Sequence, residues 1–117
     1  MKHNQRIGKW GEGAAAAFLL ERGYVIIAQN YRTPYGEIDV IARQGDVTIF
    51  IEVKTRTTNS MGLPEASITP RKRAHMISAA EYYAAETEID HWQIDVLSIE
   101  GRPGSVPKIT YFENAIT

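Results

Sequence analysis

Cysteine is absent from this sequence of 117 residues. Its absence excludes a disulfide framework, a thiolate metal site and a cysteine nucleophile, and it permits a reducing environment. Long apolar runs are absent too: no stretch approaches the length of a membrane span, and the N-terminal MKHNQRIGKWGEG lacks the apolar core of a signal peptide. We therefore expect a cytoplasmic protein that does not bind a membrane.

An excess of charge of either sign is also missing, because 13 Lys and Arg residues nearly balance 14 Asp and Glu residues. Global charge then gives no attraction to nucleic acid, and a nucleic-acid-binding protein of this composition would need its basic residues clustered on one surface. The length suits one hydrophobic core and is too short for two, so we expect residues 1–117 to form a single domain.

The most informative stretch is GEIDVIARQGDVTIFIEVKTR, at residues 36–56. Both halves are rich in Ile, Val, Thr and Phe, and the QGD between them is a short breaker, so the pattern predicts a β-hairpin. With the turn at this breaker, cross-strand partners are residues whose numbers sum to about 91. The register of the hairpin can therefore be predicted.

The predicted register gathers charge at one end of the hairpin. Asp39 faces Glu52, Glu37 faces Lys54, and alternation along the strands puts all four on one face. The apolar residues of the opposite face, expected to lie against the core, are Ile38, Val40, Ala42, Val47, Ile49, Ile51 and Val53. Like charges opposed in a sheet destabilise the pair, so Asp39 and Glu52 need a compensating positive charge.

Two explanations of the facing acids stay open. In one, Lys54 and Arg56 neutralise them as an ion-pair network on a wet sheet face. In the other, Asp39 and Glu52 share Mg²⁺ or Mn²⁺, cations that prefer carboxylate oxygen and keep several waters, and Lys54 reaches the same point. A strand-borne acid opposite an acid-any-Lys motif is the arrangement that phosphodiester hydrolysis would use.

GEID at 36–39 followed by FIEVKTR at 50–56 resembles the PD-(D/E)XK nuclease superfamily. More closely it resembles the bacterial YraN family, small proteins with a restriction-endonuclease-like core akin to archaeal Holliday junction resolvases. The similarity covers nearly the whole chain, with GKWGEGAAAAFL, RGY, NYR and IDV as further matches. Two residues depart from the pattern: Ile38 replaces a proline, and Gln93 replaces an arginine, which would weaken a phosphate contact.

The resemblance implies a metal-dependent nuclease that hydrolyses phosphodiester bonds in branched or single-stranded DNA, and a homodimer. Mg²⁺ or Mn²⁺ would be bound by Asp39, Glu52 and the Val53 carbonyl, with Glu12 as an added ligand. Lys54 would orient a water or stabilise developing charge, and Glu37 would be an accessory residue that pairs with Lys54 or holds a water. The residues implied to hold the flanking DNA backbone are Arg32, Arg56, Arg71, Lys72 and Arg73.

The first helix is predicted over about 5–22. Gly8, Gly11 and Gly13 weaken its early turns by about 1 kcal/mol each, so we expect another backbone or a ligand to approach there. Glu12 lies among them. It is either a solvated first-turn acid that suits the helix dipole or, by the resemblance, an acid that supplements the metal site.

A second helix is predicted from Pro70 to about Glu86, after Thr69 or Ser67 as N-cap. Its first turn is filled by Arg71, Lys72 and Arg73. Cations there oppose the helix dipole. They form either a tolerated exposed cluster or, together with the backbone N–H groups of the helix start, a phosphate-binding site.

Further strands are predicted at 24–31, 91–99 and 108–113, and a mobile loop at 57–68. The order α-β-β-β-α-β-β gives an α/β fold, a central mixed sheet flanked by helices, in agreement with a restriction-endonuclease-like core. Asp95, between apolar neighbours, is either a buried, hydrogen-bonded acid of the core or an outer partner of the site, and we favour the structural role. Two other functions stay open, a non-catalytic nucleic-acid-binding module that retains the nuclease fold and an adaptor protein with a surface ion-pair patch.

Overall fold

The computed structural model describes residues 2–57 and 68–116. Within these ranges the elements are α1 (Lys2–Glu21), β1 (Val25–Thr33), β2 (Gly36–Gln44), β3 (Val47–Arg56), α2 (Pro70–Thr87), β4 (Trp92–Glu100) and β5 (Lys108–Ile116). The predicted α/β class and element order are confirmed. The loop predicted at 57–68 lies almost entirely outside the described residues. No helix in the described ranges is both long and apolar enough to cross a membrane.

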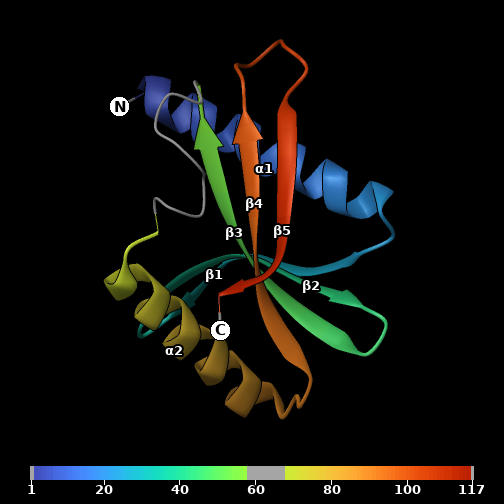
Figure 1. The fold of residues 1–117 in the computed structure, drawn as a ribbon, viewed down its shortest axis with the longest axis vertical. Helices are drawn as coiled ribbons and strands as arrows, with labels where there is room; N and C mark the ends of the chain where they lie inside the picture. The colour runs from blue at the N-terminus through green and yellow to red at the C-terminus, as the bar shows by residue number, and fades with distance from the viewer. Residues whose placement is uncertain (1, 58–67, 117) are drawn as a thin grey trace.

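The five strands form one mixed sheet in the order β1-β2-β3-β4-β5. Neighbouring strands are antiparallel except β3 and β4, which are parallel and connected through α2. Figure 1 shows β3, β4 and β5 side by side, with the β1–β2 hairpin turned across them at one end. This architecture is consistent with the restriction-endonuclease-like core that the resemblance implies.

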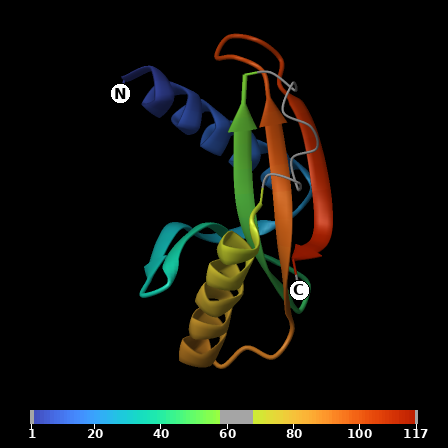
Figure 2. The same ribbon diagram turned by 60° about the vertical axis from the view of Figure 1, so that its left-hand side comes forward.

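The two helices cover opposite faces of the sheet (Figures 1 and 2). Ala15 and Leu19 of α1 are fully buried in one apolar cluster, and Ala80 and Tyr83 of α2 lie in the other. The strand residues buried on the α1 side include Val40, Ala42, Ile49, Ile51, Leu97 and Ile99. Those buried on the α2 side include Ile38, Ile41, Phe50, Ile94 and Val96. The molecule therefore has three layers, and the sheet has two apolar faces.

Helix α1 starts at Lys2, earlier than predicted, and it ends at Glu21 with a glycine-based stop. Gly23 has a φ of +85°, a conformation that glycine adopts without a steric cost. Its N–H donates to the carbonyl of Leu20, and the N–H of Tyr24 donates to the carbonyl of Leu19. This is a Schellman motif, and it turns the chain directly into β1.

One of the three glycines in α1 is required by a close approach. A Cβ on Gly11 would lie 2.0 Å from Oγ1 of Thr55, so α1 crosses β3 in near contact at this residue. A Cβ on Gly8 or Gly13 would meet nothing within 4 Å. Another backbone or a ligand was expected here; a close approach is found at Gly11 alone, and the approaching atoms belong to the Thr55 side chain of β3.

Helix α2 begins with the N-cap Thr69, one of the two caps that the sequence allows. Its Oγ1 accepts a hydrogen bond of 3.1 Å from the backbone N–H of Lys72, and Pro70 occupies the first turn. The cap fixes the position of the first turn, and with it the starting point of the Lys72 side chain.

The hairpin register is as predicted, with Val40 opposite Ile51 and Gln44 opposite Val47. The ladder ends at the Val40–Ile51 pair, although β2 continues its pairing with β1. The two strands of the hairpin therefore diverge at Asp39.

Two sequence-based expectations are wrong because of this divergence. Glu37 pairs with Arg32 of β1 and does not face Lys54. Ile38 packs on the α2 side of the sheet, whereas Val40 packs on the α1 side, so the apolar residues of β2 do not share one face.

Candidate functional site

Asp39 and Glu52 come together at the point where β2 leaves β3. The backbone N–H of Val53 donates a hydrogen bond of 2.9 Å to Oδ2 of Asp39, so a side chain takes the place of the strand pairing that has ended. The Asp39 and Glu52 carboxyl groups lie close enough that the negative charge of Glu52 acts on the Asp39 carboxyl. Glu52 is only 8% exposed. The predicted acid pair is therefore present, and the backbone of β3 holds its Asp39 member in place.

The electrostatics of the acid pair favour a positive charge or a proton. Burial, and after it the negative charge of Glu52, raises the pKa of the Asp39 carboxyl to about 7. The Val53 N–H and the charge of Lys72 act in the opposite direction. Near neutral pH the Asp39 carboxyl is therefore protonated part of the time, because burial and the negative charge of Glu52 both disfavour its ionised form.

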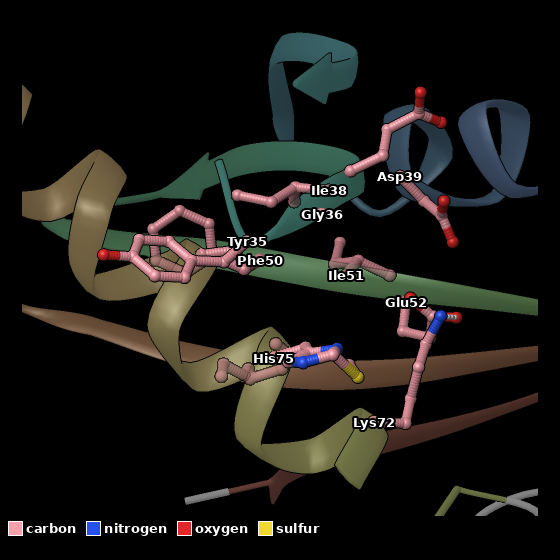
Figure 3. Close-up of a pocket in the computed structure, with 13 residues that line it drawn as sticks. Tyr35, Gly36, Ile38, Asp39, Phe50, Ile51, Glu52, Lys72 and His75 are labelled. Carbon is pink, nitrogen blue, oxygen red and sulfur yellow. Dashed lines mark ion pairs between the residues drawn. The ribbon is translucent and has the colours of Figure 1, made fainter. Parts of the chain in front are cut away.

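Lys72 supplies the positive charge nearest to this pair. Its Nζ lies 3.5 Å from Oε2 of Glu52, and Figure 3 shows the side chain extending from α2 toward that carboxylate. Lys54 was predicted to reach the acid pair. It is partly buried, and within the described residues it forms no ion pair with either acid. The ammonium group at the acids thus comes from the helix and not from the strand.

A pocket with about 100 Å³ of space opens beside the acids, between β2, β3 and the first turns of α2. Asp39, Glu52 and Lys72 form its charged end, and Tyr35 and His75 are exposed residues of its lining (Figure 3). Its apolar lining consists of Ile38, Phe50, Ile51, Met76, Ala79 and Ile94. A few waters need only about 10–15 Å³ each by this measure, so the pocket has room for a hydrated ion and a small polar group.

Glu12 and Glu37 form a second pair of acids, connected through an amide. With the Asn30 amide oriented so that its nitrogen faces both carboxylates, it donates to Oε1 of Glu37 and Oε2 of Glu12, each at 3.2 Å. Glu37 lines the pocket, and Glu12 does not. In the described part of the chain, no three Asp, Glu or His side chains gather closely enough to hold one metal ion. Glu12 as an added ligand stays a prediction.

The five basic residues predicted to hold DNA backbone lie in different surroundings. Arg56 Nη2 lies 3.8 Å from Oε1 of Glu100, and Arg73 Nη1 donates to the Ala115 carbonyl at 3.4 Å. Arg32 lies 4.0 Å from Glu37, and 90% of its side chain is exposed. Lys72 contacts Glu52, as described above, and Arg71 is exposed. The cations of the first turn of α2 therefore diverge, and each has a separate environment.

Asp95 is fully buried and has three hydrogen-bond donors around it, as a structural acid requires. Gln93 Nε2 donates at 2.9 Å and the Asn114 N–H at 2.7 Å to its Oδ1, and the Tyr111 hydroxyl donates to its Oδ2. Burial, and after it this hydrogen bond, raises the pKa of the Tyr111 hydroxyl, so it stays protonated. The Gln93 amide therefore forms a hydrogen bond within the fold.

The signal for Lys72 is present in the sequence. Its charge lies in the first turn of a helix, where the dipole disfavours a cation, and a nearby buried acid accounts for that placement. The pattern does not indicate which of the three adjacent cations turns inward.

These observations define a class of protein, an α/β domain with a pair of acids, one buried and one half-buried, and a lysine at one end of a pocket beside a mixed sheet. The chain belongs to UPF0102, an uncharacterised protein family whose model matches residues 11–99. It is 41% identical over 105 residues to a UPF0102 protein of Syntrophus aciditrophicus, covering 88% of this chain and 83% of the relative. It is also 38% identical over 120 residues to one of Dehalococcoides mccartyi, covering 99% and 98%, and 39% identical over 116 residues to one of Dictyoglomus turgidum, covering 97% and 98%.

Proposed function

We propose that this chain is a nuclease that hydrolyses phosphodiester bonds in branched or single-stranded DNA with Mg²⁺ or Mn²⁺ bound by Asp39 and Glu52. The proposal includes membership of the PD-(D/E)XK superfamily and similarity to the YraN family, on the motif at 36–56. One observation carries it. Two carboxyl groups are held together in a pocket, with the pKa of Asp39 raised to about 7. Such a pair is stabilised when a cation replaces the shared proton.

The donor set fits a hard divalent cation. Mg²⁺ is commonly bound through one or two carboxylates, and waters and substrate phosphates complete its octahedron. Asp39 and Glu52 supply the two carboxylates, and the pocket beside them leaves room for water. A softer metal that needs several His or Cys ligands does not fit, since the sequence has no cysteine and the acids have no third protein ligand among the described residues.

Each residue of the site has a distinct role in this proposal. Asp39 and Glu52 would bind the cation, and the Val53 N–H would keep the Asp39 carboxyl oriented toward it. When bound, the cation would supply Lewis-acid chemistry, neutralising phosphate charge and lowering the pKa of water. Lys54 would stabilise developing negative charge on the phosphate, and Glu37 would accept a hydrogen bond from water at the mouth of the pocket.

A second candidate is a nucleic-acid-binding module that keeps the fold and cuts nothing. It is favoured by one observation: the Glu52 carboxylate already has a counter-ion in Lys72, at 3.5 Å. The two candidates predict the same DNA binding and differ only in metal dependence and cleavage.

The test is a calorimetric titration of Mn²⁺ into the wild type, Asp39→Asn and Asp46→Asn. Asp46 is an exposed acid in the turn of the same hairpin, so its variant removes the same charge away from the site. Cleavage of labelled branched and single-stranded DNA is measured in parallel. The nuclease requires that binding and cleavage are lost in Asp39→Asn and kept in Asp46→Asn. Mn²⁺ binding that survives in Asp39→Asn, or DNA left intact by the wild type, would contradict it.

A further inference from the structure

Lys72 is the only residue in the described part of the chain that forms an ion pair with either acid of the site. The contact joins an exposed group to a buried one, because 46% of the Lys72 side chain and 9% of the Glu52 side chain are accessible. The charge of Lys72 also acts on Asp39, since it lowers the pKa of that carboxyl. The positive charge of Lys72 therefore acts on the negative charge of both acids.

The placement of this lysine is unfavourable without the acids. Lys72 lies in the first turn of α2, where the positive end of the helix dipole repels a cation. The Thr69 cap holds the turn in place by accepting the Lys72 N–H at 3.1 Å. The side chain then extends over the end of the pocket to Glu52, and Figure 3 shows this path. The ion pair with Glu52 offsets the repulsion between the Lys72 ammonium group and the dipole of α2.

The position of the ammonium group has a consequence for metal binding. A divalent cation shared by Asp39 and Glu52 would lie close to the Lys72 ammonium group, which is 3.5 Å from Oε2 of Glu52, and two cations so close repel each other strongly. Binding of the cation would therefore favour movement of the ammonium group away from Glu52. Because the Lys72 side chain is long and nearly half exposed, it can move without unfolding the helix.

We infer that Lys72 is a tethered counter-ion that competes with the divalent cation for Glu52 and, once displaced, binds a phosphate of the substrate. This inference rests on the proposed function and specifies how substrate and metal depend on each other. The free protein binds the cation weakly, because Lys72 must leave. A phosphate that takes up the ammonium group removes this competition. By reciprocity, the cation then strengthens phosphate binding by the same factor.

The first experiment is a Mn²⁺ titration of the free protein without nucleic acid, on Lys72→Met, Lys72→Arg and Arg71→Met. Arg71→Met is the matched control, since it removes the same charge from the same helical turn at an exposed residue. Lys72→Met is expected to bind Mn²⁺ about tenfold more tightly than wild type, which corresponds to about 1.4 kcal/mol. The Mn²⁺ affinities of Lys72→Arg and Arg71→Met should stay within about twofold of the wild-type affinity. Lys72→Gln is a second variant in case Lys72→Met does not fold.

The second experiment measures the affinity for a single-stranded DNA oligonucleotide with and without Ca²⁺, at a fixed salt concentration. Wild type should gain affinity on addition of the cation, and Lys72→Met should gain several-fold less, because it lacks the group that couples the two ligands. Lys108→Met is the control here, since it removes a charge from an exposed lysine of β5 outside the pocket, and it should keep the full gain.

The outcomes separate this inference from the proposed function. Tighter Mn²⁺ binding by Lys72→Met supports the competition even if no variant cleaves DNA, and in that case the nuclease proposal alone falls. Equal or weaker Mn²⁺ binding by Lys72→Met, with wild type binding the metal normally, overturns the competition and leaves the nuclease intact. Absence of Mn²⁺ binding in every variant overturns both.

Discussion

The backbone N–H of Val53 donates a hydrogen bond of 2.9 Å to Oδ2 of Asp39 at the place where β2 separates from β3. Because the two strands no longer pair there, this bond holds the acid in place beside Glu52. The bond couples the site to the fold, since a shift in the point of divergence would move Asp39 relative to Glu52. It also explains how two acids can be brought together in a sheet without directly opposed backbone pairing.

The pKa of Asp39 predicts a pH-dependent difference in stability between wild type and Asp39→Asn. Its pKa rises from 3.8 to about 7 on folding, so between these values the native state binds more protons than the unfolded state. The contribution of Asp39 to stability is therefore full below pH 3.8 and is lost as the pH rises toward 7, by at most about 1.4 kcal/mol per pH unit. Asn cannot ionise, so Asp39→Asn gains stability relative to wild type across this window.

Urea unfolding at pH 4 to 8 measures this difference, with Asp46→Asn as the control in the exposed turn. The control measures the effect of removing one negative charge from the hairpin outside the pocket. A constant difference for Asp39→Asn at every pH would show that Asp39 titrates normally in the folded protein.

The contact between Gly11 and Thr55 predicts opposite effects of two glycine substitutions in α1. Gly11→Ala places a Cβ 2.0 Å from Thr55 Oγ1, which forces α1 away from β3 and destabilises the protein by roughly 1–3 kcal/mol. Gly13→Ala meets nothing within 4 Å and should stabilise it by about 0.5–1 kcal/mol, because alanine restricts the unfolded chain and favours the helix. Chemical denaturation of the two variants checks both signs. A stable Gly11→Ala protein would mean that α1 does not cross β3 in near contact.

Asp95 is expected to be required for stability and dispensable for metal binding. Asp95→Ala leaves the Gln93 amide, the Tyr111 hydroxyl and the Asn114 N–H without their acceptor in a buried environment. The cost is on the order of 3 kcal/mol, whereas Asp90→Ala, at an exposed acid, should stay near wild type. Thermal unfolding measures the first effect, and Mn²⁺ calorimetry on folded Asp95→Asn tests the second. Loss of Mn²⁺ binding in that variant would assign Asp95 to the site.

The sequence was sufficient for the elements and the hairpin register, since these depend on local signals. Alternating Ile, Val and Phe around the QGD breaker fixed the pairing of Val40 with Ile51, and Gly23 marked the end of α1. The divergence of β2 at Asp39 depends on pairing with β1, which the hairpin pattern does not contain. For this reason the predicted contact of Glu37 with Lys54 was wrong.

Contacts that depend on three-dimensional packing were the hardest to predict. The approach of Lys72 to Glu52 follows from the crossover through α2, which places the helix start beside Glu52 within β3. The bridge from Asn30 to Glu12 and Glu37 likewise joins three separate elements. In each case the residue types were visible in the sequence, and the distances between them were set by packing.

Lys54 provides the sharpest test of the strand motif, because the structure gives it no ion pair with the acids in the described residues. If a strand-borne lysine stabilises the developing charge on the phosphate, Lys54→Ala should lower DNA cleavage roughly 100-fold or more while leaving Mn²⁺ affinity unchanged. Lys108→Ala, at an exposed lysine of β5, is the control for loss of a charge. Cleavage is measured at saturating Mn²⁺, and thermal unfolding confirms that each variant is folded.

Measuring Lys72→Met in the same assay distinguishes the role of Lys72 from that of Lys54. A lysine that competes with the metal and then holds a phosphate changes both Mn²⁺ affinity and DNA affinity, whereas one that acts only on the developing charge changes the cleavage rate alone. Full cleavage by Lys54→Ala together with strongly reduced cleavage by Lys72→Met would transfer the role of the motif lysine from β3 to α2. Since Lys72 is the ammonium group that contacts Glu52, that result would make the helix the source of positive charge in both binding and catalysis.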